Sequence, residues 1–175
     1  MGEAAFKVQD SVSKRRGSAF RKYQEMVIGK TDLWTLIKYE FVVLFFSRLP
    51  GALGLFLRSK TYPWLLGKVG RGVVFGVGVT LRHPHKIELG DGALIDDNVM
   101  LDAKGETNTG IRIGDECFVG RNSILSCKNG DIVLGNRANV GFNCEVFSSS
   151  LVDVGEDVLL SAYTYVVGGG NYDID

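Results

Sequence analysis

The sequence predicts an all-β solenoid, a parallel β-helix of hexapeptide repeats, preceded by N-terminal α-helices. Three observations favour this fold class. An aliphatic residue recurs every six positions from Val69 onward, and Gly or Asp usually follows it. Glycine is unevenly placed, since 18 of the 23 glycines fall at or after Gly67. This enrichment in glycine indicates that the C-terminal two-thirds of the chain needs repeated tight corners.

The six-residue period appears in five sets of three hexapeptides. Their first positions are Val69, Phe75, Leu81; Leu89, Ile95, Leu101; Ile113, Val119, Leu125; Leu134, Val140, Val146; and Val154, Leu160, Val166. The fifth positions are mostly small or β-branched, as at Val73 and Cys117, and His85 is an exception. Extra residues fall only between the sets, and the longest insertion is Lys104–Thr109. We therefore expect about five coils with loops at one corner.

A three-sided coil explains this spacing. Strands of a few residues, at about 3.3 Å per residue, can be joined by sharp corners into one coil of about eighteen residues. Stacked coils pair their strands in parallel, so the first position points inward and meets its counterpart in the next coil. The second position lies near a corner, where either positive φ or close backbone approach favours Gly and Asp. A period of six matches neither one face of a helix nor the alternation of a sandwich strand.

Residues 1–31 are predicted to be a polar basic tail that is disordered or weakly helical. Up to Lys30 they contain seven Lys/Arg and three Asp/Glu, a net charge of +4, and few apolar residues. A segment of this composition cannot bury enough apolar surface to offset the entropy of ordering. It also has no apolar core of the kind found in signal peptides.

Residues 32–66 are predicted to be an apolar helical segment. Asp32 is a suitable N-cap, an apolar run extends to Phe46, and Leu49-Pro50-Gly51 interrupts the helix. No uncharged apolar stretch reaches about 18 residues, which argues against a simple membrane span. Aromatic residues beside Lys and Arg fit a peripheral contact with a membrane interface. The alternative is that these helices cap the solenoid or pack in an oligomer.

Charge and cysteine content narrow the function classes. The net charge is zero, so nothing in the overall charge points to nucleic acid as a partner. The three cysteines, Cys117, Cys127 and Cys144, form no CxxC pair. An odd number of cysteines without a signal peptide favours reduced thiols in a cytoplasmic protein, where they act as small core residues.

The repeat from Val69 to Val167 resembles the left-handed β-helix acyltransferases, the group that includes galactoside, maltose and polysaccharide O-acetyltransferases. The resemblance implies a left-handed solenoid, a homotrimer, and acetyl-CoA as acyl donor, held in a groove between neighbouring subunits. It also implies a sugar or glycan hydroxyl as acceptor. In that family a histidine acts as general base on the acceptor hydroxyl.

Two segments carry the expected site. Val140–Glu145 resembles the family motif with an acceptor-side Asn, which would make Asn143 a substrate-binding residue, although an Asn in a tight corner explains it equally well. Asn171 stands where the family has its catalytic His, and an amide cannot accept a proton at neutral pH, so the catalytic base is unknown. Gly169, Gly170 and Asn171 are expected to contact substrate through their backbone. Residues 67–175 are thus expected to form about five coils, with further C-terminal coils of the family missing.

Two other functions remain open. Asn171 and the early end favour a catalytically inactive or truncated β-helix scaffold. A carbonic anhydrase of the γ type shares the solenoid but needs three histidines. This chain has two, His83 and His85, for which the alternatives are a surface or capping role, substrate contact, or a shared metal site. We expect no metal.

Overall fold

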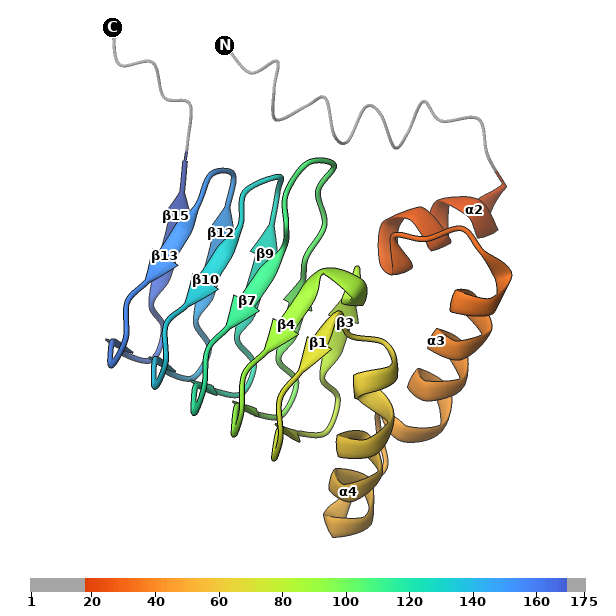
Figure 1. Ribbon diagram of the computed structural model, residues 1–175, viewed down its shortest axis with the longest axis horizontal. Coiled ribbons are helices and arrows are strands. Elements are labelled where there is room, and N and C mark those ends of the chain that lie inside the picture. Colours follow the sequence, from red (N-terminus) through yellow and green to blue (C-terminus); the bar gives the residue numbers. More distant parts are fainter. Residues whose placement is uncertain (1–17, 170–175) are drawn as a thin grey trace, which may run out of the picture.

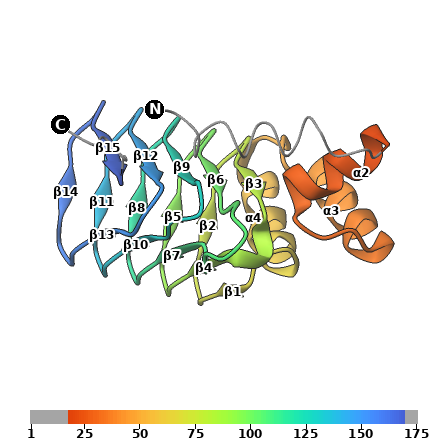
Figure 2. The same ribbon diagram turned by 90° about the horizontal axis from the view of Figure 1, so that it is seen from above.

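The computed structural model describes residues 18–169 and shows a three-sided parallel β-solenoid with helices at its N-terminal end (Figures 1 and 2). Three parallel sheets of five strands form the sides. The first sheet contains β1 (Lys68–Val69), β4 (Ile87–Leu89), β7 (Ile111–Ile113), β10 (Ile132–Leu134) and β13 (Val152–Val154). The second contains β2 (Val74–Phe75), β5 (Leu94–Ile95), β8 (Phe118–Val119), β11 (Asn139–Val140) and β14 (Leu159–Leu160). The third contains β3 (Thr80–Arg82), β6 (Met100–Asp102), β9 (Ile124–Cys127), β12 (Glu145–Ser148) and β15 (Tyr165–Gly168).

The predicted inward positions form three continuous stacks. In the third sheet, for example, Leu81 pairs in register with Leu101, Leu101 with Leu125, and Leu125 with Val146. These four side chains are at most 3% exposed. The fifth positions of the first two hexapeptides also face inward in the first four coils, as at Cys144, whereas Val158 in the last described coil is exposed. The six-residue period is confirmed as the origin of the core.

The corners differ in one detail from the expectation. Positive φ occurs at the fourth position of the first two hexapeptides of each coil, not at the second position. The residues concerned are Gly72, Gly78, Gly92, Asn98, Glu116, Asn122, Arg137, Asn143, Asp157 and Tyr163. At the second position the reason for glycine is close approach: a Cβ on Gly76 would lie 2.5 Å from the backbone of Asp96 and Asp97 in the next coil. Close backbone approach, and not positive φ, therefore explains glycine at the second position.

Among residues 18–66, four helical elements precede the solenoid. They are α2 (Ala19–Tyr23), a π-helix (Gln24–Ile28), α3 (Leu33–Phe46) and α4 (Gly51–Thr61), and a 3-10 turn follows at Tyr62–Trp64. Asp32 caps α3 as predicted, because its Oδ1 accepts from the Thr35 N–H at 2.8 Å. Pro50 lies directly before α4, at the predicted break. Residues 19–28, within the segment expected to be disordered or weakly helical, form helices, and Ile28 is fully buried in the common core.

Side chains of the helices attach them to the first coil. The hydroxyls of Tyr39 and Tyr62 donate to the carbonyls of Leu81 (2.8 Å) and Val79 (3.2 Å). Burial raises the pKa of both tyrosines to about 12, so both remain protonated donors. The helices therefore cap the N-terminal end of the solenoid, which was one of the two expectations for this segment. In the part of the chain from 18 to 169, no helix has the length and apolarity needed to cross a membrane.

Candidate functional site

Asn143 lies at the corner between the second and third sheets, two residues before β12. Its φ of 55° is the left-handed conformation that Asn tolerates. Its Oδ1 accepts from Asn122 Nδ2 at 3.2 Å, and Asn122 Oδ1 accepts from Asn98 Nδ2 at 3.4 Å, so the three amides form a ladder along the corner. Within residues 18–169, the Nδ2 group of Asn143 has no hydrogen-bond partner. The ladder therefore ends with two N–H bonds that can be donated outward.

Aromatic and cationic side chains surround this amide. The Arg121 guanidinium lies 4.1 Å from the ring centroid of Phe142, and that ring also contacts Phe118 edge-on at 6.3 Å. Tyr163, in register on the next coil, is 78% exposed. We call Arg121, Asn122, Phe142, Asn143 and Tyr163 the Asn143 corner. It combines apolar ring faces with amide and guanidinium donors, which is the donor set that suits a polyhydroxylated ligand.

Gly169 lies apart from this corner. It follows β15, whose residue Tyr165 pairs with Glu145, so Gly169 is six residues further along the strand direction than Asn143. That offset corresponds to roughly 20 Å. Gly169 packs instead against Ser150, whose Oγ would lie 2.5 Å from a Cβ at that position. Gly170 and Asn171 lie outside the described residues. Within one chain, the structure does not bring Asn143 and Gly169 together.

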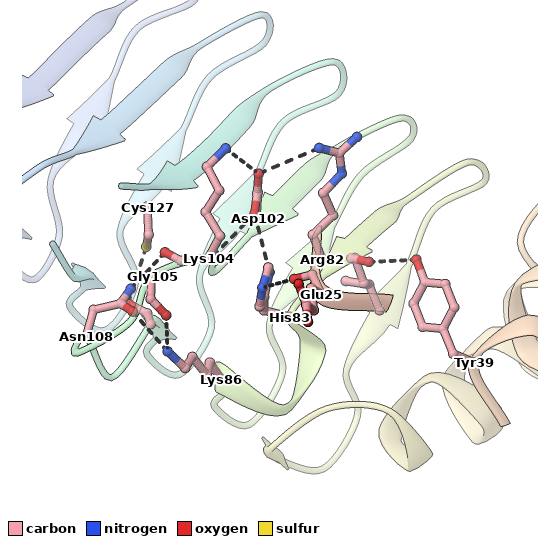
Figure 3. Close-up of polar contacts among 12 residues, drawn as sticks. Glu25, Tyr39, Arg82, His83, Lys86, Asp102, Lys104, Gly105, Asn108 and Cys127 are labelled. Atoms are coloured by element: carbon pink, nitrogen blue, oxygen red, sulfur yellow. Dashed lines mark hydrogen bonds and ion pairs between the residues drawn. The ribbon is translucent and has the colours of Figure 1, made fainter. Parts of the chain in front are cut away.

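A second polar cluster lies where β3 and β6 end, near the N-terminal helices, and we call its members Arg82, His83, Asp102 and Lys104 the Asp102 cluster (Figure 3). The Asp102 side chain is 3% exposed, and its Oδ2 lies 3.0 Å from Lys104 Nζ and 3.9 Å from Arg82 Nη1. His83 Nδ1 lies 3.9 Å from Asp102 Oδ1. The sequence contained no signal for Asp102, because Arg82 and His83 belong to the preceding coil and only Lys104 is near it in sequence.

His83 has a carboxylate neighbour, as a general base does, but its ring nitrogens are not accessible to a substrate. Its Nε2 lies 3.1 Å from the carbonyl oxygen of Glu25 in the π-helix, so that nitrogen is occupied. Its Nδ1 is buried and has no hydrogen-bond partner among the described residues. A Cβ on Gly29 would lie 2.2 Å from the His83 ring, which shows how closely the imidazole packs on the π-helix. His83 thus serves as a structural contact between helix and solenoid and cannot reach an acceptor hydroxyl.

The two histidines lie outside the strands. His83 precedes the 3-10 turn Pro84–Lys86, which contains His85, and their ring centroids lie 6.4 Å apart. Among residues 18–169, no group of three His, Cys, Asp or Glu side chains is placed to hold a metal ion. The capping role is the alternative that fits these contacts.

The two partly buried histidines lead us to expect that the free energy of unfolding falls in acid. Burial lowers the pKa of His85 to about 4, and Lys30 adds to this effect; burial also lowers the pKa of His83, against the opposing influence of Asp102. Folded pKa values below the unfolded value of about 6.5 mean that stability is present above pH 6.5 and is lost as pH falls. We expect a loss of about 1–2 kcal/mol between pH 7 and pH 5, measured by urea unfolding.

The control for this prediction is the double variant H83Q/H85Q, which removes both histidines of the chain. Its free energy of unfolding should change little over the same pH range. Carboxylates such as Asp32 have a lowered pKa and titrate further down, so the interval from pH 7 to pH 5 isolates the imidazoles. An equal pH dependence in the double variant and the parent would contradict the assignment.

The remaining reactive groups are unsuited to nucleophilic catalysis. All three cysteines lie within the described residues and are buried and free, as expected. Burial raises the pKa of the Cys117 and Cys127 thiols, which disfavours the reactive thiolate.

A small pocket between α3 and the first coil is lined by Tyr39, Val43, Ser47, Arg48, Tyr62, Gly78, Val79, Thr80 and Leu81. The two tyrosine hydroxyls in it already donate to backbone carbonyls.

Comparison with known proteins yields two structural likenesses. No protein-family model and no curated protein matches the sequence. One solved structure is a hexapeptide-repeat-containing acetyltransferase, VCA0836, from Vibrio cholerae O1 biovar eltor, complexed with acetyl-coenzyme A. It has 16% identity and a TM-score of 0.47, and the match covers 79% of this chain and 91% of that one. Another is the serine acetyltransferase CysE of Neisseria gonorrhoeae in complex with serine. It has 18% identity and a TM-score of 0.37, with coverage of 88% and 66%. At this level of similarity the activity has to be argued from the chain's own residues.

Proposed function

We propose that this chain is an acyl-CoA-dependent O-acetyltransferase that modifies a hydroxyl of a sugar or polysaccharide. The observation that carries the proposal is the outward amide of Asn143 at an aromatic corner of a hexapeptide solenoid. The repeat and the segment Val140–Glu145 resemble the acyltransferase family at this position. In the proposed complex the Asn143 Nδ2 group donates to an acceptor oxygen, and the rings of Phe142 and Tyr163 pack against the sugar.

Acetyl-CoA is the proposed donor, and no metal takes part. The acceptor hydroxyl oxygen attacks the thioester carbonyl carbon, the carbon–sulfur bond breaks, and CoA leaves as the thiol after taking up a proton. A base must accept the hydroxyl proton. Asn171 occupies the sequence position at which the family has a histidine, and an amide cannot fill that role. We therefore expect donor binding to be retained and the transfer step to be slow.

The enzyme is proposed to work as a homotrimer in the cytoplasm, at the inner face of the membrane where surface glycans are assembled. The resemblance to trimeric acyltransferases supports the assembly, and the reduced cysteines fit the compartment. Asn143 and Gly169 lie on different ends of adjacent strands within one chain. A site that used both would need contributions from two subunits.

The test is calorimetric titration of acetyl-CoA together with an acetyl-transfer assay on a panel of sugars. We expect the parent chain to bind acetyl-CoA, and N171H to raise the transfer rate at least about 100-fold, because general base catalysis contributes about that much. N143G should weaken acceptor binding without changing donor affinity. The matched control is N98G, at the other end of the same ladder and with a similar φ of 57°.

The second candidate is a catalytically inactive scaffold, and the residue that favours it is Asn171. It predicts the same solenoid with no affinity for acetyl-CoA in either the parent or N171H. That result would overturn the proposed activity. Binding in both chains, with transfer gained only in N171H, would support an acyltransferase site that lacks its base.

A further inference from the structure

Helices α3 and α4 expose a broad apolar surface on the side that faces away from the solenoid. On α3, Leu36, Tyr39 and Val42 are buried toward the first coil. Ten large apolar side chains on α3, α4 and the following turn are each at least 42% exposed. We call them the outer helix face: Leu33, Trp34, Ile37, Phe41, Leu44, Phe45, Leu53, Leu55, Phe56 and Trp64. Both views place these helices beyond the first coil, at one end of the molecule (Figures 1 and 2).

The pattern along α3 differs from that of an ordinary surface helix. Ile37, Phe41 and Leu44 follow one another at helical spacing on the exposed side, opposite the buried stripe. A surface helix usually carries charged or polar residues there, and a helix that is apolar on all sides requires a second apolar partner. Exposed apolar patches rimmed by polar residues mark protein or membrane contacts.

Charge identifies the kind of partner. The net charge of zero hides a separation within the described residues, because residues 18–66 contain seven Lys/Arg and three Asp/Glu, a net of +4. Residues 67–169 contain nine Lys/Arg and thirteen Asp/Glu, a net of −4. Lys38, Arg48 and Lys60 lie on or beside α3 and α4, and Lys60 Nζ lies 5.7 Å from the Phe56 ring centroid. The positive end of the molecule is therefore also its apolar end.

We propose that the outer helix face docks on an anionic lipid bilayer, with α3 and α4 lying in the headgroup region and the solenoid directed away from it. Tryptophan and tyrosine rings prefer this depth, and each Lys or Arg near the surface adds to the attraction. The 14 residues of α3 extend about 21 Å, so the whole helix can lie in the plane of the interface. The acidic solenoid would be repelled by the same surface, which sets the orientation. This inference rests on the helices and not on the proposed acyltransferase activity.

Intrinsic fluorescence provides a direct readout, since both tryptophans of the chain, Trp34 and Trp64, belong to the outer helix face. The full chain is titrated with phosphatidylcholine vesicles and with vesicles containing one quarter phosphatidylglycerol. We expect a blue shift and at least roughly tenfold tighter binding to the anionic vesicles. The difference should shrink in about 0.5 M salt, where charge attraction is screened within a few ångströms.

Two variants separate the apolar and the charged contributions. L44S/F45S should weaken binding to anionic vesicles at least roughly tenfold, because two exposed anchors are lost. R48E/K60E should abolish the preference for anionic over neutral vesicles. The matched controls lie on the solenoid: L159S removes an apolar side chain that is 68% exposed, and K128E reverses an exposed cation. Both controls should bind as the parent does, and circular dichroism checks that all variants fold.

Three results would overturn the proposal. The first is equal binding to neutral and anionic vesicles, and the second is no binding to either. The third is concentration-dependent self-association in sedimentation velocity that L44S/F45S abolishes, which would assign the outer helix face to a second copy of the chain. Acetyl-CoA affinity is measured in parallel, so loss of membrane binding and loss of donor binding are distinguishable.

Discussion

Replacing Arg58 with methionine is expected to lower the free energy of unfolding by about 2–4 kcal/mol. Arg58 is 2% exposed, and its guanidinium donates to three backbone carbonyls, those of Phe75 (2.9 Å), Phe46 (3.3 Å) and Leu49 (2.7 Å). Methionine retains the apolar stem but leaves these acceptors without a donor in a buried place. Burial lowers the pKa of Arg58, against the opposing influence of Tyr62 and Asp97, and the group stays charged at neutral pH, so the hydrogen bonds to these carbonyls help to offset its desolvation.

The three carbonyls belong to the end of α3, the α3–α4 turn and strand β2, so one side chain joins both helices to the first coil. In R58M, tryptophan fluorescence, which reports on the helices, should therefore show unfolding at a lower urea concentration than in the parent. The control is K60M on the same helix, where an exposed cation is replaced by the same side chain. If R58M and K60M unfold at the same urea concentration, the anchoring role is wrong.

Replacing Gly76 with alanine is expected to cost about 3 kcal/mol or more. The backbone φ is ordinary, so alanine would fit in isolation. Its Cβ would lie 2.5 Å from the carbonyl carbon of Asp96 and from the backbone nitrogen of Asp97. The next coil would have to move away, although parallel strands pair at a fixed spacing of about 4.8 Å. The side chain of Asp97, which accepts from the Val77 N–H at 2.7 Å, would be displaced as well.

Gly155 provides a matched control, because it occupies the same hexapeptide position in the last described coil. A Cβ there would meet only Val158 Cγ2, at 3.8 Å. G155A should therefore change the unfolding free energy by less than about 0.5 kcal/mol. Circular dichroism during urea unfolding measures both variants. Equal effects of G76A and G155A would show that glycine is needed here for flexibility and not for the close approach of coils.

The site could be predicted only in part. Asn143 lies at a solenoid corner with an outward amide, and the corner alternative accounts for its φ and its ladder. Asp102 was missed, because only Lys104 is near it in sequence, whereas Arg82 and His83 belong to the preceding coil and meet it after the coils stack. Asn143 and Gly169 are the fourth residues of different hexapeptides, and their separation of six residues along the strand direction became clear from the strand pairing.

In the helices, too, some features were predictable from the local sequence and others depended on the folded structure. The cap at Asp32 and the break at Pro50 follow from local preferences and were predicted. Apolar residues cover α3 on both sides, so hydrophobicity alone could not say which stripe would be buried. The disorder expected for residues 18–28 was also a local inference. Burial of Ile28 and the contact of Glu25 with His83, 58 residues later, depend on the folded solenoid.

The sequence by itself determined the solenoid, because a six-residue period repeats the same local conformation and places every first position inward. It also determined the start of α3 after Asp32 and the break before α4 at Pro50. Only the tertiary structure decided the contacts between coils and with the capping helices. Close approach of backbones requires glycine at the second position, and positive φ occurs at the fourth. These features depend on neighbours about twenty or more residues away, whose distance no local pattern encodes.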